Sequence, residues 1–383
     1  MRPTPTGTRS QALIWRQPGW PDLRYDATSV ASAVALARRA QGIVEGKLAA
    51  IEFEQRQEIS AETWTQEALS TAAIEGERLD LEAVRSSIAR RLGVGSAKFA
   101  NTPRHVDGLL DVMDDAVAQA HKPVTNERLQ AWQAALFPTG YSGMARIRVG
   151  GYREHSEPMQ IVSGRIGRET VHYVAPPSAA VQKEMDRFLA WLGGDAEPNG
   201  LIKAALAHLW FETIHPFEDG NGRIGRAIVD LILARESGEP TRVLRISQQL
   251  MARRGDYYDQ LERAQHGELD VTAWVVWFVE QVQGAFDAAS SVIDLSLAKA
   301  IFWNRHRAKD LSPRQRKAVN VLLDAGPGGF VGGMSTRKYE GLTGAARATA
   351  SRDLIELAAL GLLVQVGAGR GTRYDLQIDW SLA

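Results

Sequence analysis

Hydrophobic residues recur every three to four positions along most of the chain, a spacing that indicates amphipathic helices. Helical patterns run over residues 27 to about 57, over 61–92 and, as two segments, over 101–137. They resume over 179–193 and 200–217, and three more helical stretches follow before about residue 309. The chain is therefore predicted to be mainly α-helical.

A different pattern lies between two of these helical regions. Residues 159–162 and 170–174 are short apolar runs on either side of a turn that contains Gly and Arg, and Pro176 and Pro177 follow. Short β-prone runs that are bounded by such turn residues predict a β-hairpin.

The last 75 or so residues form a separate pattern. Residues 312–326 and 335–363 indicate three helices with a tight turn between the second and third, and 363–378 indicate two strands around a Gly-Arg turn. Three helices followed by a hairpin predict a winged helix-turn-helix. We therefore expect an N-terminal helical domain over 1–98, a core over 99–290, and a linker helix with a winged helix over 291–383.

Composition narrows the class of protein. Of 383 residues, 44% are hydrophobic, and Lys plus Arg equals Asp plus Glu at 45 each, so net charge favours neither nucleic acid nor membrane. The absence of cysteine excludes disulfides, thiolate metal sites and cysteine nucleophiles. No signal peptide and no run of about 18 apolar residues is present, so we expect a cytoplasmic protein with no membrane partner.

Polar chemistry concentrates in HPFEDGNGRIGR, residues 215–226. Pro216 disfavours helical geometry at the preceding residue, so His215 is expected at a helix end. The glycines at 220 and 222 permit positive φ, which turns backbone N–H groups into an anion-binding concavity. A helix that begins near Arg223 would add its N-terminal dipole, and Arg226 would project from the same side. This combination favours phosphoryl or nucleotidyl transfer.

The twelve residues fill every fixed position of the HPFx(D/E)GNGRxxR signature and so resemble the Fic family. The resemblance implies transfer of AMP from ATP to a Ser, Thr or Tyr hydroxyl of a target protein, with self-modification included. It implies that His215 is the general base and that Asp219 holds Mg²⁺. Gly220, Asn221 and Gly222 would form the anion hole, with Asn221 in contact with the α-phosphate. Arg223 would contact the β-phosphate and Arg226 the γ-phosphate.

A second segment resembles a regulatory motif of the same family. STAAIEGE, residues 70–77, matches the (S/T)xxxE(G/N) inhibitory helix through Thr71, Glu75 and Gly76, within a helix around 63–76 that Gly76 ends. Thr71 and Glu75 are one helical turn apart and can face one neighbour. The resemblance implies that Glu75 pairs with Arg226 and displaces the γ-phosphate. In some relatives the same glutamate supports AMP removal, and this alternative stays open.

Two further segments resemble substrate-contacting parts of the family. The hairpin is placed where Fic proteins have a flap that binds an extended target segment, and its matching residues are Ile161, Val162, Ser163 and Gly164. A lid without direct target contact is the alternative. Residues 253–270 resemble the helix that completes an adenine pocket, with Tyr258, Tyr257 and Gln265 as candidates and core packing as the alternative.

Other readings of these segments remain. A metal site of His208, Glu212 and His215 is disfavoured, because Pro216 moves His215 off the helix face.

From residue 305 onward Lys and Arg exceed Asp and Glu by five, and Arg347, Arg352, Arg370 and Arg373 are placed for DNA phosphates. Protein docking is an equal alternative for this domain, and the resemblance also points to a homodimer.

The whole sequence thus supports two functions of different class. One is a self-inhibited protein adenylyltransferase; the other is a DNA-binding regulator whose core senses a nucleotide. Within the enzyme class, transfer of another phosphate-linked group is a further alternative. An intact histidine and metal-binding acid favour the enzyme, since a sensor has no need of His215.

Overall fold

A computed structural model describes residues 13–93, 102–163, 170–237 and 243–380. Within these ranges lie fourteen α-helices and three two-stranded antiparallel sheets, which confirms the predicted mainly α fold. No helix in the described ranges is both long enough and apolar enough to span a bilayer. The predicted flap residue Gly164 lies outside the described residues.

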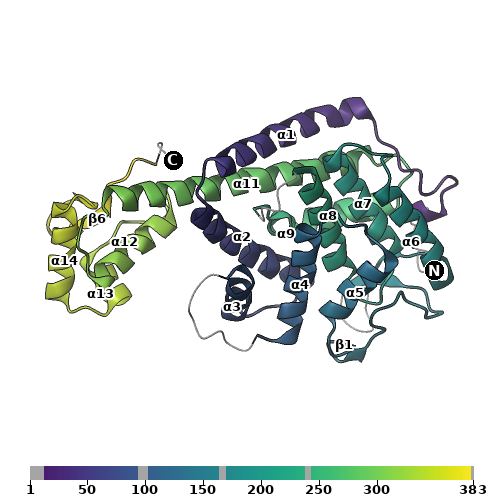
Figure 1. The fold of residues 1–383 in the computed structure, drawn as a ribbon, viewed down its shortest axis with the longest axis horizontal. Helices are drawn as coiled ribbons and strands as arrows, with labels where there is room; N and C mark the ends of the chain where they lie inside the picture. The colour runs from purple at the N-terminus through teal and green to yellow at the C-terminus, as the bar shows by residue number, and fades with distance from the viewer. Residues whose placement is uncertain (1–12, 94–101, 164–169, 238–242, 381–383) are drawn as a thin grey trace, which may run out of the picture. The chain divides into compact units, whose positions relative to one another are not determined.

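The chain divides into two compact units, residues 1–289 and 290–383. The first unit contains ten complete helices and the start of an eleventh (Figure 1). Their bounds are α1 Ala27–Ala49, α2 Phe53–Ile74, α3 Leu81–Leu92, α4 Arg104–Ala118, α5 Asn126–Leu136, α6 Ser178–Gly193, α7 Gly200–Ile214, α8 Asn221–Ser237, α9 Ile246–Ala252, α10 Arg254–Gln265 and α11 Thr272–Arg305.

The helix α7 forms the centre of the first unit. All its residues are buried except Lys203, whose ammonium group reaches out to the carbonyl of Gly194 at 2.7 Å. A helix that is apolar on every side belongs in a core, and α7 packs most extensively against α8. Other helices of the unit surround this pair (Figure 1). The two segments that flank the signature are therefore largely buried and pack against each other.

The predicted helix over 27–57 is wrong in its C-terminal part. The helix α1 ends at Ala49, and α2 starts at Phe53 after a short turn. The turn buries Ile51, which is 4% exposed, and the Arg56 guanidinium donates to the Ile51 carbonyl at 3.0 Å. The chain turns here around a buried side chain, although the local sequence favours helix on both sides.

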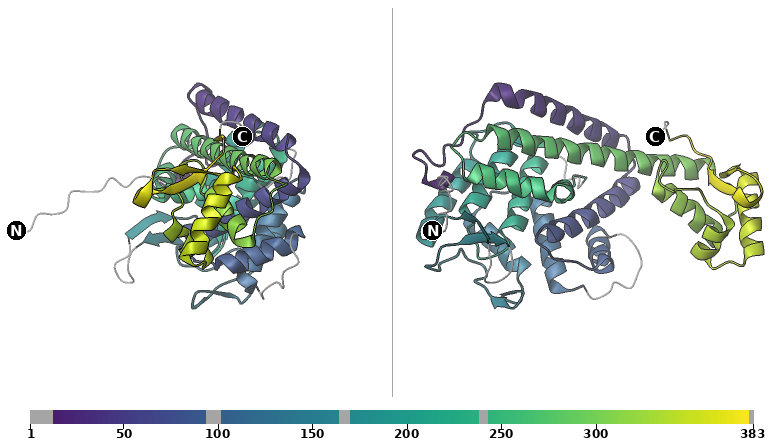
Figure 2. Two further views of the ribbon diagram at one scale, coloured as in Figure 1. Left: turned by 90° about the vertical axis from the view of Figure 1, so that its left-hand side faces the viewer. Right: turned by 180° about the vertical axis from the view of Figure 1, so that it is seen from behind.

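The predicted hairpin is confirmed as β3 Gln160–Ser163 and β4 Thr170–Val174. It stands at the edge of the helical unit (Figure 2). The Tyr173 hydroxyl donates to the Thr213 carbonyl at 2.9 Å, which fixes the hairpin to the last turn of α7. A second, smaller hairpin, β1 Tyr141–Ser142 with β2 Ala145–Arg146, was not predicted because two-residue strands carry no periodic signal.

The second unit has the predicted order of three helices and a hairpin. Its elements after the end of α11 are α12 Pro313–Ala325, α13 Thr336–Thr343, α14 Arg347–Ala359, β5 Leu363–Val366 and β6 Arg373–Leu376. Gly344 adopts a left-handed φ of 70° in the tight turn between α13 and α14. A buried cluster that includes Leu322, Tyr339, Leu354 and Leu363 gives this unit its own core.

Candidate functional site

The histidine of the signature lies at the C-terminal end of α7. His215 has φ 50° and ψ 59°, which is the left-handed region, and Pro216 follows it. A residue with a Cβ atom adopts this conformation at a cost of about 1–2 kcal/mol, so the surroundings must hold it there. The turn takes His215 out of the helical conformation, and 17% of its side chain is exposed.

Arg153 holds this helix end in place. Its side chain is 1% exposed and donates to the carbonyls of His215 at 2.8 Å, Ile214 at 3.2 Å and Pro176 at 2.5 Å. The last carbonyls of a helix lack partners within the helix, and a buried guanidinium can satisfy several of them at once. This role could not be predicted from the sequence, because a lone arginine between loop residues has no pattern.

The His215 imidazole is unprotonated at neutral pH. Burial, followed by the positive charge of Arg153, lowers its pKa to about 4. Its Nδ1 atom lies 3.6 Å from Glu212 Oε2 one turn back on α7. Burial and the negative charge of Glu75 raise the pKa of Glu212 to about 8. A neutral imidazole thus lies beside a carboxyl group that titrates near neutral pH.

The loop after His215 is shaped by Asn221 and Gly220. The Asn221 side chain accepts from the Phe217 N–H and donates to the Phe217 carbonyl, both at 2.9 Å, which closes the loop on itself. Gly220 has φ 90°, and an added Cβ would lie 3.0 Å from the Phe137 ring. Phe217 is fully buried beneath the loop. The Gly220 N–H donates to Asp219 Oδ1 at 2.6 Å, and the first turn of α8, whose N–H groups have no partner within the helix, follows directly.

The expectation of positive φ at Gly222 is wrong. The helix α8 begins at Asn221, two residues earlier than predicted, and Gly222 lies in its first turn. Its lack of a side chain has another use: an added Cβ would lie 2.3 Å from Glu75 Oε1 and 3.0 Å from Arg226 Nη1. Gly222 therefore leaves room for the Glu75 carboxylate at the N-terminus of α8.

The second arginine of the signature is engaged by α2. Arg226 is 2% exposed and donates to Glu75 Oε1 at 2.8 Å, to Thr71 Oγ1 at 2.8 Å and to the Thr71 carbonyl at 3.0 Å. Burial opposes both charges, but the pair outweighs it: the pKa of Glu75 is lowered and that of Arg226 is raised. The three residues that the two motifs singled out are in direct contact, and Gly76, with φ 81°, follows the end of α2.

The first arginine and the predicted metal ligand lie close together. Arg223 Nη2 is 3.7 Å from Asp219 Oδ1, its Nη1 is 3.3 Å from Glu77 Oε2, and its guanidinium covers the Phe137 ring. Asp219 Oδ2 also accepts from the Ser142 hydroxyl. Its side chain is 39% exposed, so one carboxylate is accessible beside the anion-binding loop.

The aromatic candidates of α10 differ in accessibility. Tyr258 is 37% exposed, and its hydroxyl donates to the Ile74 carbonyl at 3.3 Å, next to Glu75. Tyr257 is 2% exposed and packs in the core, where its hydroxyl lies 2.9 Å from His208 Nε2. Gln265 is also buried. Tyr258 is thus the tyrosine that presents a face near the loop.

The described flap residues lie at an open sheet edge. Val162 is 46% exposed, and the register with β4 shifts between Ile161 and Val162. Ser163 ends β3, and Thr170 is its partner across the hairpin. Since β3 pairs with β4 alone within the described residues, its other edge has unpaired backbone groups.

His208 has a structural role. It is fully buried among Tyr257, Trp274 and Phe278, and burial together with the charge of Arg226 lowers its pKa to about 3. In the part of the chain that the structure describes, no three His, Asp or Glu side chains gather as metal ligands.

Comparison with known proteins agrees with this geometry. Residues 123–233 match the Fic/DOC family, and residues 13–94 match a domain of unknown function, DUF4172. A crystal structure of a Fic family protein from Desulfovibrio desulfuricans has a TM-score of 0.56 at 21% identity and covers 94% of this chain and 98% of its own. The chain therefore contains a Fic/DOC domain, in the fold of solved Fic proteins.

Other relatives extend the comparison. A Fic-domain signaling protein from Bacteroides thetaiotaomicron has a TM-score of 0.51 at 18% identity and covers 67% of this chain and 96% of its own. The protein adenylyltransferase Fic of Nematostella vectensis is 27% identical over 242 residues, which cover 61% of this chain and 51% of the relative. The chain thus spans about half the length of this curated relative.

Proposed function

We propose that the protein is an adenylyltransferase that transfers AMP from ATP to a hydroxyl side chain of a target protein. The observation that carries the proposal is the unprotonated imidazole of His215, held at the end of α7 beside the anion-binding loop that leads into α8. The Fic/DOC match over this segment and the similarity to a protein adenylyltransferase support the choice of AMP.

The residues present suit each part of the reaction. His215 takes the proton of the target hydroxyl, whose oxygen attacks the α-phosphorus of ATP. A new P–O bond forms, the bond to the β-phosphate oxygen breaks, and pyrophosphate leaves. Backbone N–H groups around Gly220 and Gly222, with the Asn221 loop and Arg223, stabilise the charge that develops on phosphate oxygens.

Asp219 is the residue that would hold Mg²⁺. A hard cation of this size is commonly bound by one or two carboxylates together with substrate phosphates, and Asp219 offers a half-exposed carboxylate at the loop. When bound, the ion would neutralise phosphate charge. Glu218 stands at the variable position of the signature, and its carboxylate accepts from the Arg148 N–H at 2.9 Å.

We infer that Glu75 inhibits this reaction. Arg226 is the expected partner of the γ-phosphate, and Thr71 and Glu75 occupy its Nε and Nη2 donors. ATP must then compete with an ion pair that is only partly open to water, where screening is weak. Removal of the Glu75 carboxylate would free the guanidinium for the nucleotide.

Two exposed groups suit contacts with the target protein and with the adenine of ATP. The free edge of β3 suits an extended target segment, because main-chain pairing makes few demands on side chains. Tyr258 suits stacking against adenine, since its ring is accessible and lies beside Ile74 at the end of α2.

Intact-mass measurement of the full chain after incubation with ATP and Mg²⁺ tests the proposal. Glu75→Gly should gain AMP on itself or on added lysate proteins at least tenfold faster than the unchanged chain, because a buried charge-assisted contact is removed. His215→Ala in the same background should gain none. If Glu75→Gly and the double variant label alike, the proposed function is wrong.

A further inference from the structure

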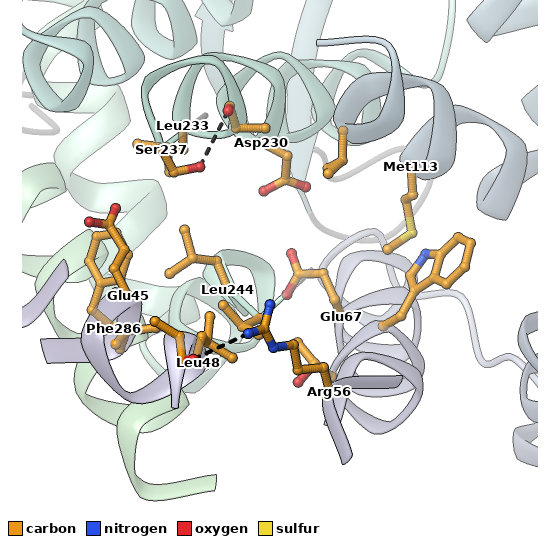
Figure 3. A pocket seen from close by; sticks show the side chains of 17 residues that line it. Glu45, Leu48, Arg56, Glu67, Met113, Asp230, Leu233, Ser237, Leu244 and Phe286 are labelled. Atoms are coloured by element: carbon orange, nitrogen blue, oxygen red, sulfur yellow. Dashed lines mark hydrogen bonds between the residues drawn. The ribbon is translucent and has the colours of Figure 1, made fainter. Parts of the chain in front are cut away.

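A cavity of about 250 Å³ lies in the first unit between α1, α2 and the C-terminal half of α8, whereas the signature loop lies at the N-terminus of α8. Neither His215 nor the anion-binding loop lines it (Figure 3). Most of its wall is hydrocarbon, from Val44, Leu48, Met113, Leu233, Val243 and Phe286. An apolar engineered cavity of about 150 Å³ is large enough for benzene, so this one has space for a six-membered ring and a short chain.

Two carboxyl groups from opposite walls face each other across this cavity (Figure 3). Glu67 of α2 is 4% exposed and accepts from the N–H groups of Ser247 at 2.7 Å and Gln248 at 3.2 Å. Asp230 of α8 has no hydrogen-bond donor among the residues that the structure describes. Burial, and then the charge of Glu67, raise the pKa of Asp230 well above its usual value.

Asp230 is partly buried and lacks a hydrogen-bonded cation. The charge of Arg226, one turn earlier on α8, acts on it, but the Arg226 guanidinium is bonded to Thr71 and Glu75. A carboxylate that is withdrawn from water without a donor is costly, and a hydrogen-bonded cation relieves that cost. Among the described residues that line the cavity, Glu45, Glu67 and Asp230 are acidic and only Arg56 is basic. The Arg56 guanidinium is itself directed to the Ile51 carbonyl at 3.0 Å.

We propose that this cavity binds a small primary amine with a hydrocarbon body, whose ammonium group lies between Glu67 and Asp230. The ammonium supplies three N–H donors to two carboxylates, and the hydrocarbon body replaces empty space against the apolar wall. Neither a carboxylic acid nor a phosphate fits, since each would add negative charge beside two acids.

The position of the site joins it to the helices that hold Arg226. Glu67, Thr71 and Glu75 follow at intervals of four along α2, and Arg226 and Asp230 do so along α8, so each set shares a helix face. The ion pair and the carboxyl pair are therefore successive links between the same two helices. An amine at the second link adds contacts across that interface.

Calorimetric titration of the full chain tests the site with 2-phenylethylamine, and with 2-phenylethanol as the neutral counterpart. We expect saturable one-to-one binding of the amine, at least tenfold tighter than the alcohol, because its hydrogen bonds are charge-assisted. The amine should also raise the melting temperature. Asp230→Asn should lower the affinity for the amine to that for the alcohol. Asp256→Asn, at an exposed position, should leave the affinity for the amine unchanged.

A filled cavity gives the second arm of the test. Ala234→Leu places extra methyl groups in the cavity and should abolish binding of both compounds. Circular dichroism checks that Ala234→Leu is folded. If it is not, Leu48→Phe is the replacement variant that fills the same cavity. Equal affinity for amine and alcohol, amine binding that survives both Asp230→Asn and a folded filled variant, or no saturable heat would each overturn the proposal. These readouts do not depend on transfer of AMP.

Discussion

At the scale of single residues, the site contains buried polar groups whose protonation states are inverted from those in water. Glu212 is 5% exposed, and its Oε1 atom has no hydrogen-bond partner among the described residues. Burial and the Glu75 charge raise its pKa from 4.5 to about 8, while burial and Arg153 lower that of His215 from 6.5 to about 4. Near pH 7 the carboxyl group is mostly protonated and the imidazole is neutral, which preserves a free lone pair for a base.

The raised pKa of Glu212 predicts a pH-dependent stability. The folded protein holds this proton more tightly than the unfolded chain, so the stabilisation is complete below pH 4.5 and is lost as pH rises toward 8. The loss is on the order of a few kcal/mol. Glu212→Gln cannot ionise, so its free energy of unfolding, measured by urea titration, should fall less between pH 5 and pH 8.

Glu82→Gln is the matched control for this measurement. Its side chain is 79% exposed on α3, and its replacement should leave the pH dependence as in the unchanged chain. Parallel curves for the unchanged chain and Glu212→Gln would mean that Glu212 is ionised in the folded protein across this range.

At the scale of elements, the contact between α2 and α8 decides whether the site is open to nucleotide. The two helices are far apart in the sequence, yet Thr71 and Glu75 of one and Arg226 of the other form three hydrogen bonds. The N-terminus of α8 can approach the Glu75 carboxylate because position 222 is glycine. Helix packing thus places an intramolecular carboxylate where a phosphate is expected.

Thr71→Val should release part of this inhibition. The change removes the hydroxyl that accepts from Arg226 Nε at 2.8 Å but keeps the carbonyl contact and the side-chain shape. A hydrogen bond to a charged group contributes about 1.5–3 kcal/mol. Incorporation of AMP from ATP labelled at the α-phosphate should therefore lie between that of the unchanged chain and that of Glu75→Gly.

Thr65→Val on the same helix is its control. The Thr65 hydroxyl bonds to the Ala61 carbonyl within α2 at 2.8 Å and does not touch Arg226. Labelling should equal that of the unchanged chain. If Thr71→Val and Thr65→Val behave alike, Thr71 has no part in the inhibition.

At the scale of the whole molecule, the two units have separate cores. The second unit is organised around its own buried cluster, in which Leu354 of α14 is fully buried while the adjacent Ile355 is 56% exposed. A unit with its own core can unfold in a transition of its own. The proposed chemistry lies entirely in the first unit.

Leu354→Ala is therefore expected to destabilise the second unit by about 2–5 kcal/mol, because it leaves a cavity in that core. Scanning calorimetry should show a lower melting temperature for one transition, and AMP incorporation by the Glu75→Gly background at 25 °C should be unchanged. Ile355→Ala should shift no transition. A loss of labelling in folded Leu354→Ala would show that the second unit contributes to the reaction.

Much of the site was predictable because its residues are close in the sequence. The order His, Pro, acid and Gly-Asn-Gly over 215–222 predicts a helix end, a tight loop and a new helix from local preferences alone, and all three are present. The break after α1 at Ala49 was missed, because Ile51 is buried in a turn between two helical patterns, and α8 starts at Asn221 rather than near Arg223.

The sequence by itself determined the helical fold, the hairpin and the polar loop, since each follows from periodicity and turn chemistry over a few residues. Only the tertiary structure decided that Arg153 holds the strained His215, that Tyr257 is buried while Tyr258 is accessible, and that Glu67 and Asp230 share a cavity. These facts depend on contacts between residues tens to hundreds of positions apart, and such contacts arise from the packing of whole helices, which leaves no local pattern in the chain.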